Sequence, residues 1–146
     1  MILLENLIGK DVELTSLPIE HQDNLLLLLN CINQVQVICP YTFIVTSGYR
    51  TRQHHINIYT AKGITDLKLI PWGSKHLIGA AVDIYDSQKD IQNWCFKNQR
   101  ILAGIGLWLE EFASEEYPKG TTNWVHFQCK PYGSWKPGKS IFFRPF

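Results

Sequence analysis

Two short segments with strict polar and apolar alternation constrain the fold of this chain more than any other feature of its sequence. In Ala80–Tyr85, the two-residue period of a strand places Asp83 on one face and branched apolar residues on the other. In Asn123–Cys129, the same period separates His126 from a second apolar set. Such segments are typical of a sheet with one face against a core, so Asp83 and His126 are expected on the same polar face.

The rest of the chain predicts helices that cover the apolar face of this sheet. Apolar residues recur every three or four positions from about His21 to Val37, which indicates a helix with one buried side. Thr42–Thr46 predicts a strand that ends before a turn at Gly48. The other expected elements are a short helix stopped by Gly63, a helix capped by Ser87 that runs to Asn98, and a strand over Gly106–Phe112 that forms a hairpin with Asn123–Cys129. This order predicts one α+β domain over residues 1–146, with a small antiparallel sheet and helices packed on one side.

Composition narrows the classes of function. The 146 residues carry 14 Lys and Arg against 13 Asp and Glu, so the chain lacks the basic excess of a typical nucleic-acid binder. The longest apolar run, Leu25–Leu29, is far shorter than a membrane-spanning helix, and Met1–Lys10 has no basic region before an apolar stretch. The four cysteines form no CxxC pair and are expected to be buried thiols. We therefore expect a monomer without a signal peptide, made in a reducing cytoplasm.

One spacing in the sequence suggests metal chemistry. His76 precedes Asp83 by seven residues with small residues between them, so that a loop and a strand can converge with His126 on the neighbouring strand. Two histidines and one carboxylate suit a catalytic metal site, which keeps a further position for water. The alternative is a surface loop histidine, a turn carboxylate and a hydrogen-bonded strand histidine. Spacing alone leaves both interpretations open and favours the second.

Three motifs in order along the chain resemble the M15 zinc peptidases. The motifs are Ser47-Gly48-Tyr49-Arg50, then Ser74-x-His76-x-x-Gly79-x-Ala81-x-Asp83, and last Trp124-Val125-His126. The group includes D-Ala-D-Ala carboxypeptidases, D-Ala-D-Ala dipeptidases and phage L-alanyl-D-glutamate endolysins, and the Hedgehog signalling fold is a distant relative. The resemblance implies a Hedgehog-type peptidase fold with Zn²⁺ held by His76, Asp83 and His126.

The same resemblance implies roles for residues around the metal. Arg50 matches the family arginine that holds a substrate carboxylate or polarised carbonyl, and Ser74 matches a serine that bonds to substrate or to a ligand. Asn123 stands where several members carry a glutamate that acts as general base. On the partner strand of the hairpin, Glu110 and Glu111 can face the metal, and Glu111 is the candidate catalytic carboxylate. The plainer alternatives are a surface arginine, a loop serine and solvated glutamates.

The resemblance implies a zinc metallopeptidase that hydrolyses peptidoglycan stem peptides, as a D-Ala-D-Ala carboxypeptidase or an L-Ala-D-Glu endopeptidase. The expected setting is a phage-type lysin that acts on the cell wall after release or as part of a virion. One alternative is a zinc-containing, non-catalytic structural or interaction protein on the same fold, such as a virion component, and another is a zinc-free protein. His54 and His55 could line the cleft, and the aromatic and basic tail from Lys130 to Phe146 could bind glycan or complete the core.

Overall fold

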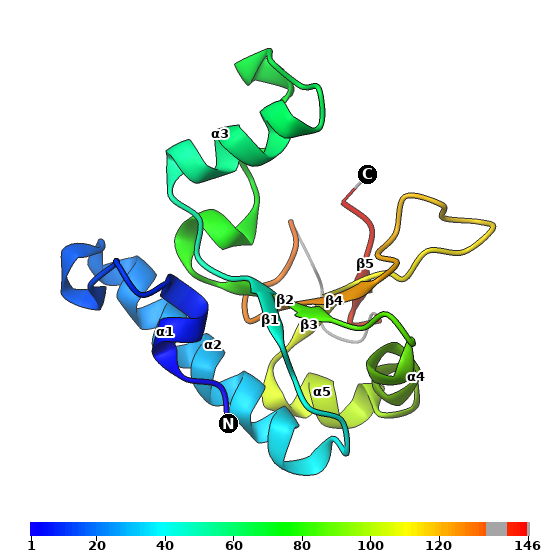
Figure 1. Cartoon of the computed structure of the whole chain (residues 1–146). Helices are drawn as coiled ribbons and strands as arrows, with labels where there is room; N and C mark the ends of the chain where they lie inside the picture. Colours follow the sequence, from blue (N-terminus) through cyan, green and yellow to red (C-terminus); the bar gives the residue numbers. More distant parts are fainter. Residues whose placement is uncertain (134–139, 146) are drawn as a thin grey trace.

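A five-stranded mixed sheet lies at the centre of the molecule, with the strand order β1-β2-β4-β3-β5 (Figure 1). The structure is a computed structural model that describes residues 1–133 and 140–145. Strands β1, β2, β4 and β3 pair antiparallel in turn, and β5 joins β3 in parallel. The strands are β1 Val45–Ser47, β2 Ala81–Tyr85, β3 Trp108–Glu110, β4 Trp124–Gln128 and β5 Phe142–Phe143.

Helices gather on one side of the sheet, where α2, α4 and α5 lie, while α3 stands on the opposite side (Figure 1). The helices are α1 Leu4–Ile8, α2 Ile19–Ile38, α3 Arg52–Ala61, α4 Asp90–Lys97 and α5 Gln99–Ile105. Three 3₁₀ helices lie between them, η1 Leu14–Ser16, η2 Leu67–Leu69 and η3 Lys75–Ile78. In the part of the chain that the structure describes, no helix is both long enough and apolar enough to cross a bilayer.

The predicted alternation separates a core face of the sheet from a polar face. On the core face, side chains of β2 and β4 pack against side chains of α2, and both sets are completely buried. The strands contribute Val82, Ile84, Val125 and Phe127, and the helix contributes Leu25, Leu28, Ile32 and Val35. On the polar face, Asp83 of β2 lies directly opposite His126 of β4 in the strand register. The expected α+β class and the shared polar face are therefore confirmed, and the four cysteines are buried free thiols as expected.

Two details of the predicted fold are wrong. The sheet is mixed, because the tail returns beside β3 and pairs with it in parallel at Leu109 and Phe142. The helix after β2 is capped by Asp86, whose carboxylate accepts hydrogen bonds from the backbone N–H groups of Ile91 (3.1 Å) and Gln92 (2.8 Å). Lys89, at φ 62°, turns the chain so that Asp86 rather than Ser87 reaches the helix start.

Candidate metal centre

His76 is positioned by η3, the short 3₁₀ helix that comes directly before β2. Gly79 ends this helix in the left-handed conformation, at φ 76°. A Cβ atom at Gly79 would also lie 2.8 Å from Leu25 Cγ and 2.9 Å from the His21 carbonyl oxygen, so the helix packs too tightly on α2 for a side chain there. The glycine of the motif therefore allows the tight turn that carries the chain from His76 into the strand of Asp83.

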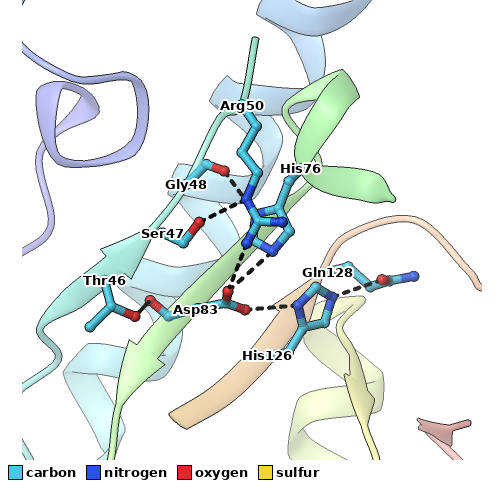
Figure 2. A network of polar contacts seen from close by, with 8 residues as sticks. All are labelled: Thr46, Ser47, Gly48, Arg50, His76, Asp83, His126 and Gln128. Atoms are coloured by element: carbon cyan, nitrogen blue, oxygen red, sulfur yellow. Dashed lines mark hydrogen bonds and ion pairs between the residues drawn. The ribbon is translucent and has the colours of Figure 1, made fainter. Parts of the chain in front are cut away.

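His76, Asp83 and His126 form one buried cluster on the polar face (Figure 2). One ligand atom from each residue lies within 4.8 Å of the other two. His126 Nδ1 is 2.8 Å from Asp83 Oδ1, and His76 Nε2 is 3.3 Å from Asp83 Oδ2. The structure thus brings together the three residues that the sequence predicted as ligands, and the group could hold a metal ion.

The outer nitrogen of each histidine has a hydrogen-bond acceptor of its own. His76 Nδ1 donates to the carbonyl oxygen of Gly48 at 2.7 Å. His126 Nε2 lies 3.0 Å from Gln128 Oε1, while Gln128 Nε2 donates to the Lys130 carbonyl oxygen at 2.7 Å, so the amide oxygen faces the histidine. The bond to Gly48 leaves a free lone pair on His76 Nε2 that points at Asp83. His126 Nδ1 lies in hydrogen-bond contact with Asp83 Oδ1, so it donates a proton to the carboxylate in the metal-free cluster.

This arrangement fits a bound cation. His76 Nε2 is buried and has no hydrogen-bond partner among the described residues. Lone pairs of two neutral histidines repel an ionised carboxylate, so the cluster needs positive charge between its members, either a proton or a metal ion. Histidines that donate their other N–H to a carbonyl or amide oxygen are typical of metal sites, where this bond fixes the ring. The orphaned nitrogen and the donor set are what a divalent ion with nitrogen and oxygen ligands requires.

Burial and mutual charge shift the pKa values of all three residues of the cluster. Burial alone raises the pKa of Asp83, but His76 and His126 outweigh it through charge and hydrogen bonds and hold that pKa well below its usual range. Burial lowers the pKa of His76, and Asp83 offsets this only in part. Burial also lowers the pKa of His126, but hydrogen bonds and charge from Asp83 raise it overall. Asp83 is therefore ionised and His76 neutral at neutral pH, which are the forms that bind metal, whereas the raised pKa of His126 favours a proton that a metal ion would have to displace.

Arg50 reaches the cluster from the turn after β1. Its Nε donates to Ser47 Oγ at 3.0 Å, and its Nη2 donates to Asp83 Oδ2 at 3.4 Å (Figure 2). Its backbone N–H also donates to the His76 carbonyl oxygen at 3.0 Å. Burial lowers the pKa of Arg50, and the charge of Asp83 opposes the shift. The guanidinium therefore places a fixed positive charge at the edge of the ligand group.

The other residues predicted around the metal have hydrogen-bond partners outside the His76-Asp83-His126 cluster. Ser74 is the residue before η3, and its carbonyl oxygen accepts from Leu77 N, but its hydroxyl makes no capping bond. Asn123 is exposed, and its carbonyl oxygen accepts from Asp86 N. The structure gives Glu111 a partner away from the cluster, because its carboxylate accepts two hydrogen bonds from Arg144 that lower its pKa. Of the two adjacent glutamates, Glu110 and Glu111, the pairing of Trp108 with Gln128 places Glu110 on the polar face.

Several residues that shape the site were not predicted as functional. Gln128 and Gly48 orient the two histidines, and Gln128 could have been found from the sequence because it shares a strand face with His126.

The two histidines that could line the cleft lie outside the cluster. His55 is completely buried, and its Nε2 bonds to the Pro71 carbonyl oxygen at 3.1 Å, which helps to hold the loop before η3. His54 is exposed.

The described part of the tail contributes both to the core and to the site. Ile141 is buried in the core, and the ring of Phe143 stands edge-on to that of His126 at a centroid distance of 5.9 Å. The described part of the tail therefore forms a final strand that helps to complete the core, which is one of the two alternatives expected from the sequence. Trp135, Lys136 and Phe146, which belong to the same predicted aromatic and basic tail, lie outside the described residues.

Comparisons of the chain with protein-family models, with curated proteins and with solved structures gave no match. The resemblance to the M15 zinc peptidases thus stays a prediction from the motifs. The geometry by itself defines a buried His-Asp-His group that could hold a metal ion, with an arginine beside it.

Proposed function

We propose that the protein is a zinc-dependent metallopeptidase that hydrolyses peptide bonds in peptidoglycan stem peptides. The observation that carries the proposal is the convergence of His76 Nε2 and His126 Nδ1 on the carboxylate of Asp83, with Arg50 at the edge of the group. The order of the three sequence motifs supports the same conclusion.

Zinc is the metal that best suits this donor set. Catalytic zinc sites in proteins commonly have three nitrogen or oxygen ligands and keep one further position open. When bound, zinc supplies a Lewis acid that polarises a carbonyl group and makes water more acidic. In the protein, His76, Asp83 and His126 would hold the ion, and their hydrogen bonds to Gly48 and Gln128 keep the two rings in place.

Arg50 is the group that would bind an acidic peptide. A guanidinium has five N–H donors in a planar fork, and the bonds to Ser47 and Asp83 use only part of them. A carboxylate is the natural partner for the rest. Stem peptides carry such a group at the D-Ala terminus and at D-Glu, so Arg50 would orient the substrate for a D-Ala-D-Ala carboxypeptidase or an L-Ala-D-Glu endopeptidase.

The biological setting that we propose is a phage-type lysin, which acts on the wall after release or as part of a virion. A formal charge of +1 provides little general attraction to an anionic wall. Binding would then depend on the site itself.

The test is the release of peptide termini from purified sacculi. We expect the wild-type protein to release them, and a chelator to stop the reaction until zinc is restored. His126→Ala should be inactive, whereas His54→Ala, which changes an exposed histidine outside the cluster, should keep wild-type activity. A wild-type protein that contains one zinc per chain and releases no termini would overturn the proposal.

A non-catalytic zinc protein is the second candidate. It is favoured by the burial of the cluster, in which no ligand residue is more than 8% exposed. Structural metal sites are typically closed in this way. For this candidate, His126→Ala should lower the melting temperature, and neither the wild type nor the variant should release termini. A protein purified without metal, and unable to take up zinc, would exclude both candidates.

A further inference from the structure

One row of residues crosses four strands on the polar face of the sheet. Asp83 of β2 lies opposite His126 of β4, and Glu110 of β3 lies opposite Phe143 of β5. Strands β4 and β3 are joined by the pairs Trp108 with Gln128 and Leu109 with Phe127. Continuing that register by one residue places Glu110 opposite His126, so that Asp83, His126, Glu110 and Phe143 follow one another across the sheet. Because adjacent strands lie about 4.8 Å apart, Glu110 is the first neighbour of His126 on the side away from Asp83.

The side chain of Glu110 shares the face of the cluster. Residues two apart on a strand point to the same face, so Glu110 and Trp108 share a face. Trp108 is paired with Gln128, whose amide contacts His126. Glu110 is half-buried, beside a strand whose Phe143 ring reaches that of His126. Glu110 therefore lies on the same face of the sheet as the candidate ligands Asp83 and His126.

The other carboxylates near β3 and β4 are committed elsewhere or exposed. Asp83 lies between the two histidines, and Glu111 is held by Arg144. Glu115 and Glu116 are exposed in the segment that joins the two strands. Among the described residues on this side of the sheet, Glu110 is therefore the carboxylate that faces the cluster without serving as one of its three candidate ligands.

We propose that Glu110 is the proton acceptor and donor of the hydrolysis, an inference that rests on the proposed peptidase function. A water molecule attacks the scissile carbonyl carbon and forms the new C–O bond, and one of its protons passes to a Glu110 carboxylate oxygen. The C–N bond then breaks, and Glu110 delivers that proton to the leaving amine nitrogen. The remaining proton of the water stays with the acid product, so Glu110 returns to its starting state.

The test compares three single substitutions of glutamate by glutamine, at positions 110, 111 and 115. Zinc content and zinc affinity are measured first, together with the melting temperature, and turnover on sacculi afterwards. Glu110→Gln keeps the shape of the side chain but cannot take up a proton. We expect it to bind one zinc with an affinity within about threefold of the wild type and to lose on the order of 100-fold or more in kcat. Glu115→Gln, which changes an exposed carboxylate, is the matched control and should behave as the wild type.

A Glu110→Asp variant separates chemistry from packing, because it keeps the carboxylate and should retain measurable turnover that Glu110→Gln lacks. The inference is overturned if Glu110→Gln keeps wild-type turnover, if Glu111→Gln alone becomes inactive, or if Glu110→Gln loses zinc and thereby shows a role in binding the metal. If the wild type itself releases no termini, the proposed function fails, and this outcome is distinct from an active wild type with an equally active Glu110→Gln.

Discussion

On the two faces of the central sheet, the same strands serve different purposes. The core face of β2 and β4 presents Val82, Ile84 and Phe127, which are completely buried and make non-directional contacts with the helices. The polar face presents Asp83 and His126, which are also buried but depend on bonds with defined donors and acceptors. The two buried faces therefore have different requirements. Side chains on the core face must fill the available volume, whereas each polar atom of the cluster needs a hydrogen-bond partner or an opposite charge.

The difference predicts that the two faces respond differently to substitution. An apolar side chain that is truncated leaves a cavity, and the cost appears in the stability of the whole fold. A polar side chain that is changed leaves its neighbours with an unmatched charge or lone pair, and the cost appears mainly in what the site can bind. Unfolding and metal binding, measured on the same variants, separate the two faces.

The largest expected effect is on the core face. Phe127 is among the largest fully buried side chains and stacks on Phe43 at a centroid distance of 5.8 Å. Phe127→Ala should lower the free energy of unfolding by about 3–5 kcal/mol. Urea unfolding of the metal-free protein measures this, and Phe96→Ala, at a position 65% exposed, is the control, with an expected change below about 0.5 kcal/mol. Equal losses in the two variants would show that the core face is not where stability resides.

The next effect concerns the charge at the centre of the polar face. Asp83→Asn removes the carboxylate that faces both histidines and Arg50. We expect zinc affinity, measured by competition with a chelator, to fall by about 100-fold or more. The free energy of unfolding should fall by about 1–3 kcal/mol, less than in Phe127→Ala, because the buried Arg50 loses its partner. Unchanged zinc affinity in Asp83→Asn would contradict the assignment of the site.

Gln128 provides a finer test, since it touches the cluster without belonging to it. Gln128→Leu removes the oxygen that accepts from His126 Nε2, so the ring should be held less firmly. Zinc affinity should fall by about 10- to 100-fold, and the pKa of His126 in the metal-free protein, followed by nitrogen chemical shifts, should fall because the bond to Gln128 helps to raise it. Gln88→Leu, at an exposed position, should change neither quantity. An unchanged pKa of His126 and unchanged zinc affinity in Gln128→Leu would mean that another group orients the ring.

The smallest effect is the pH dependence of the metal-free fold. The folded-state pKa of Asp83 lies below its unfolded value, so the unfolded chain binds the proton first as the pH falls. The contribution of Asp83 to stability is therefore complete above the ordinary carboxyl pKa of about 4 and is lost progressively below it. Between pH 6 and pH 3, urea unfolding should show a loss larger in the wild type than in Asp83→Asn, by on the order of 1 kcal/mol. Parallel pH profiles would exclude a low pKa for Asp83.

Short-range patterns predicted much of the fold and most of the candidate site. The alternation around Asp83 and His126 placed both on one face, and the spacing of His76 before a glycine turn brought it to the same place. The partners of Glu110 and Glu111 were not predictable in this way. The two adjacent residues face opposite sides of a strand, but only the pairing of β3 with β4 and the position of Arg144 show that Glu110 lies beside His126 and that Glu111 is held by Arg144.

The sequence by itself therefore determined which residues share a face, because the two-residue period of a strand is a local property of the backbone. Only the tertiary structure decided that β5 runs parallel to β3, that Gly48 and Gln128 orient the two histidines, and that Glu110 lies next to His126. Those contacts join segments far apart in the chain, and their formation depends on how the whole sheet packs on its helices.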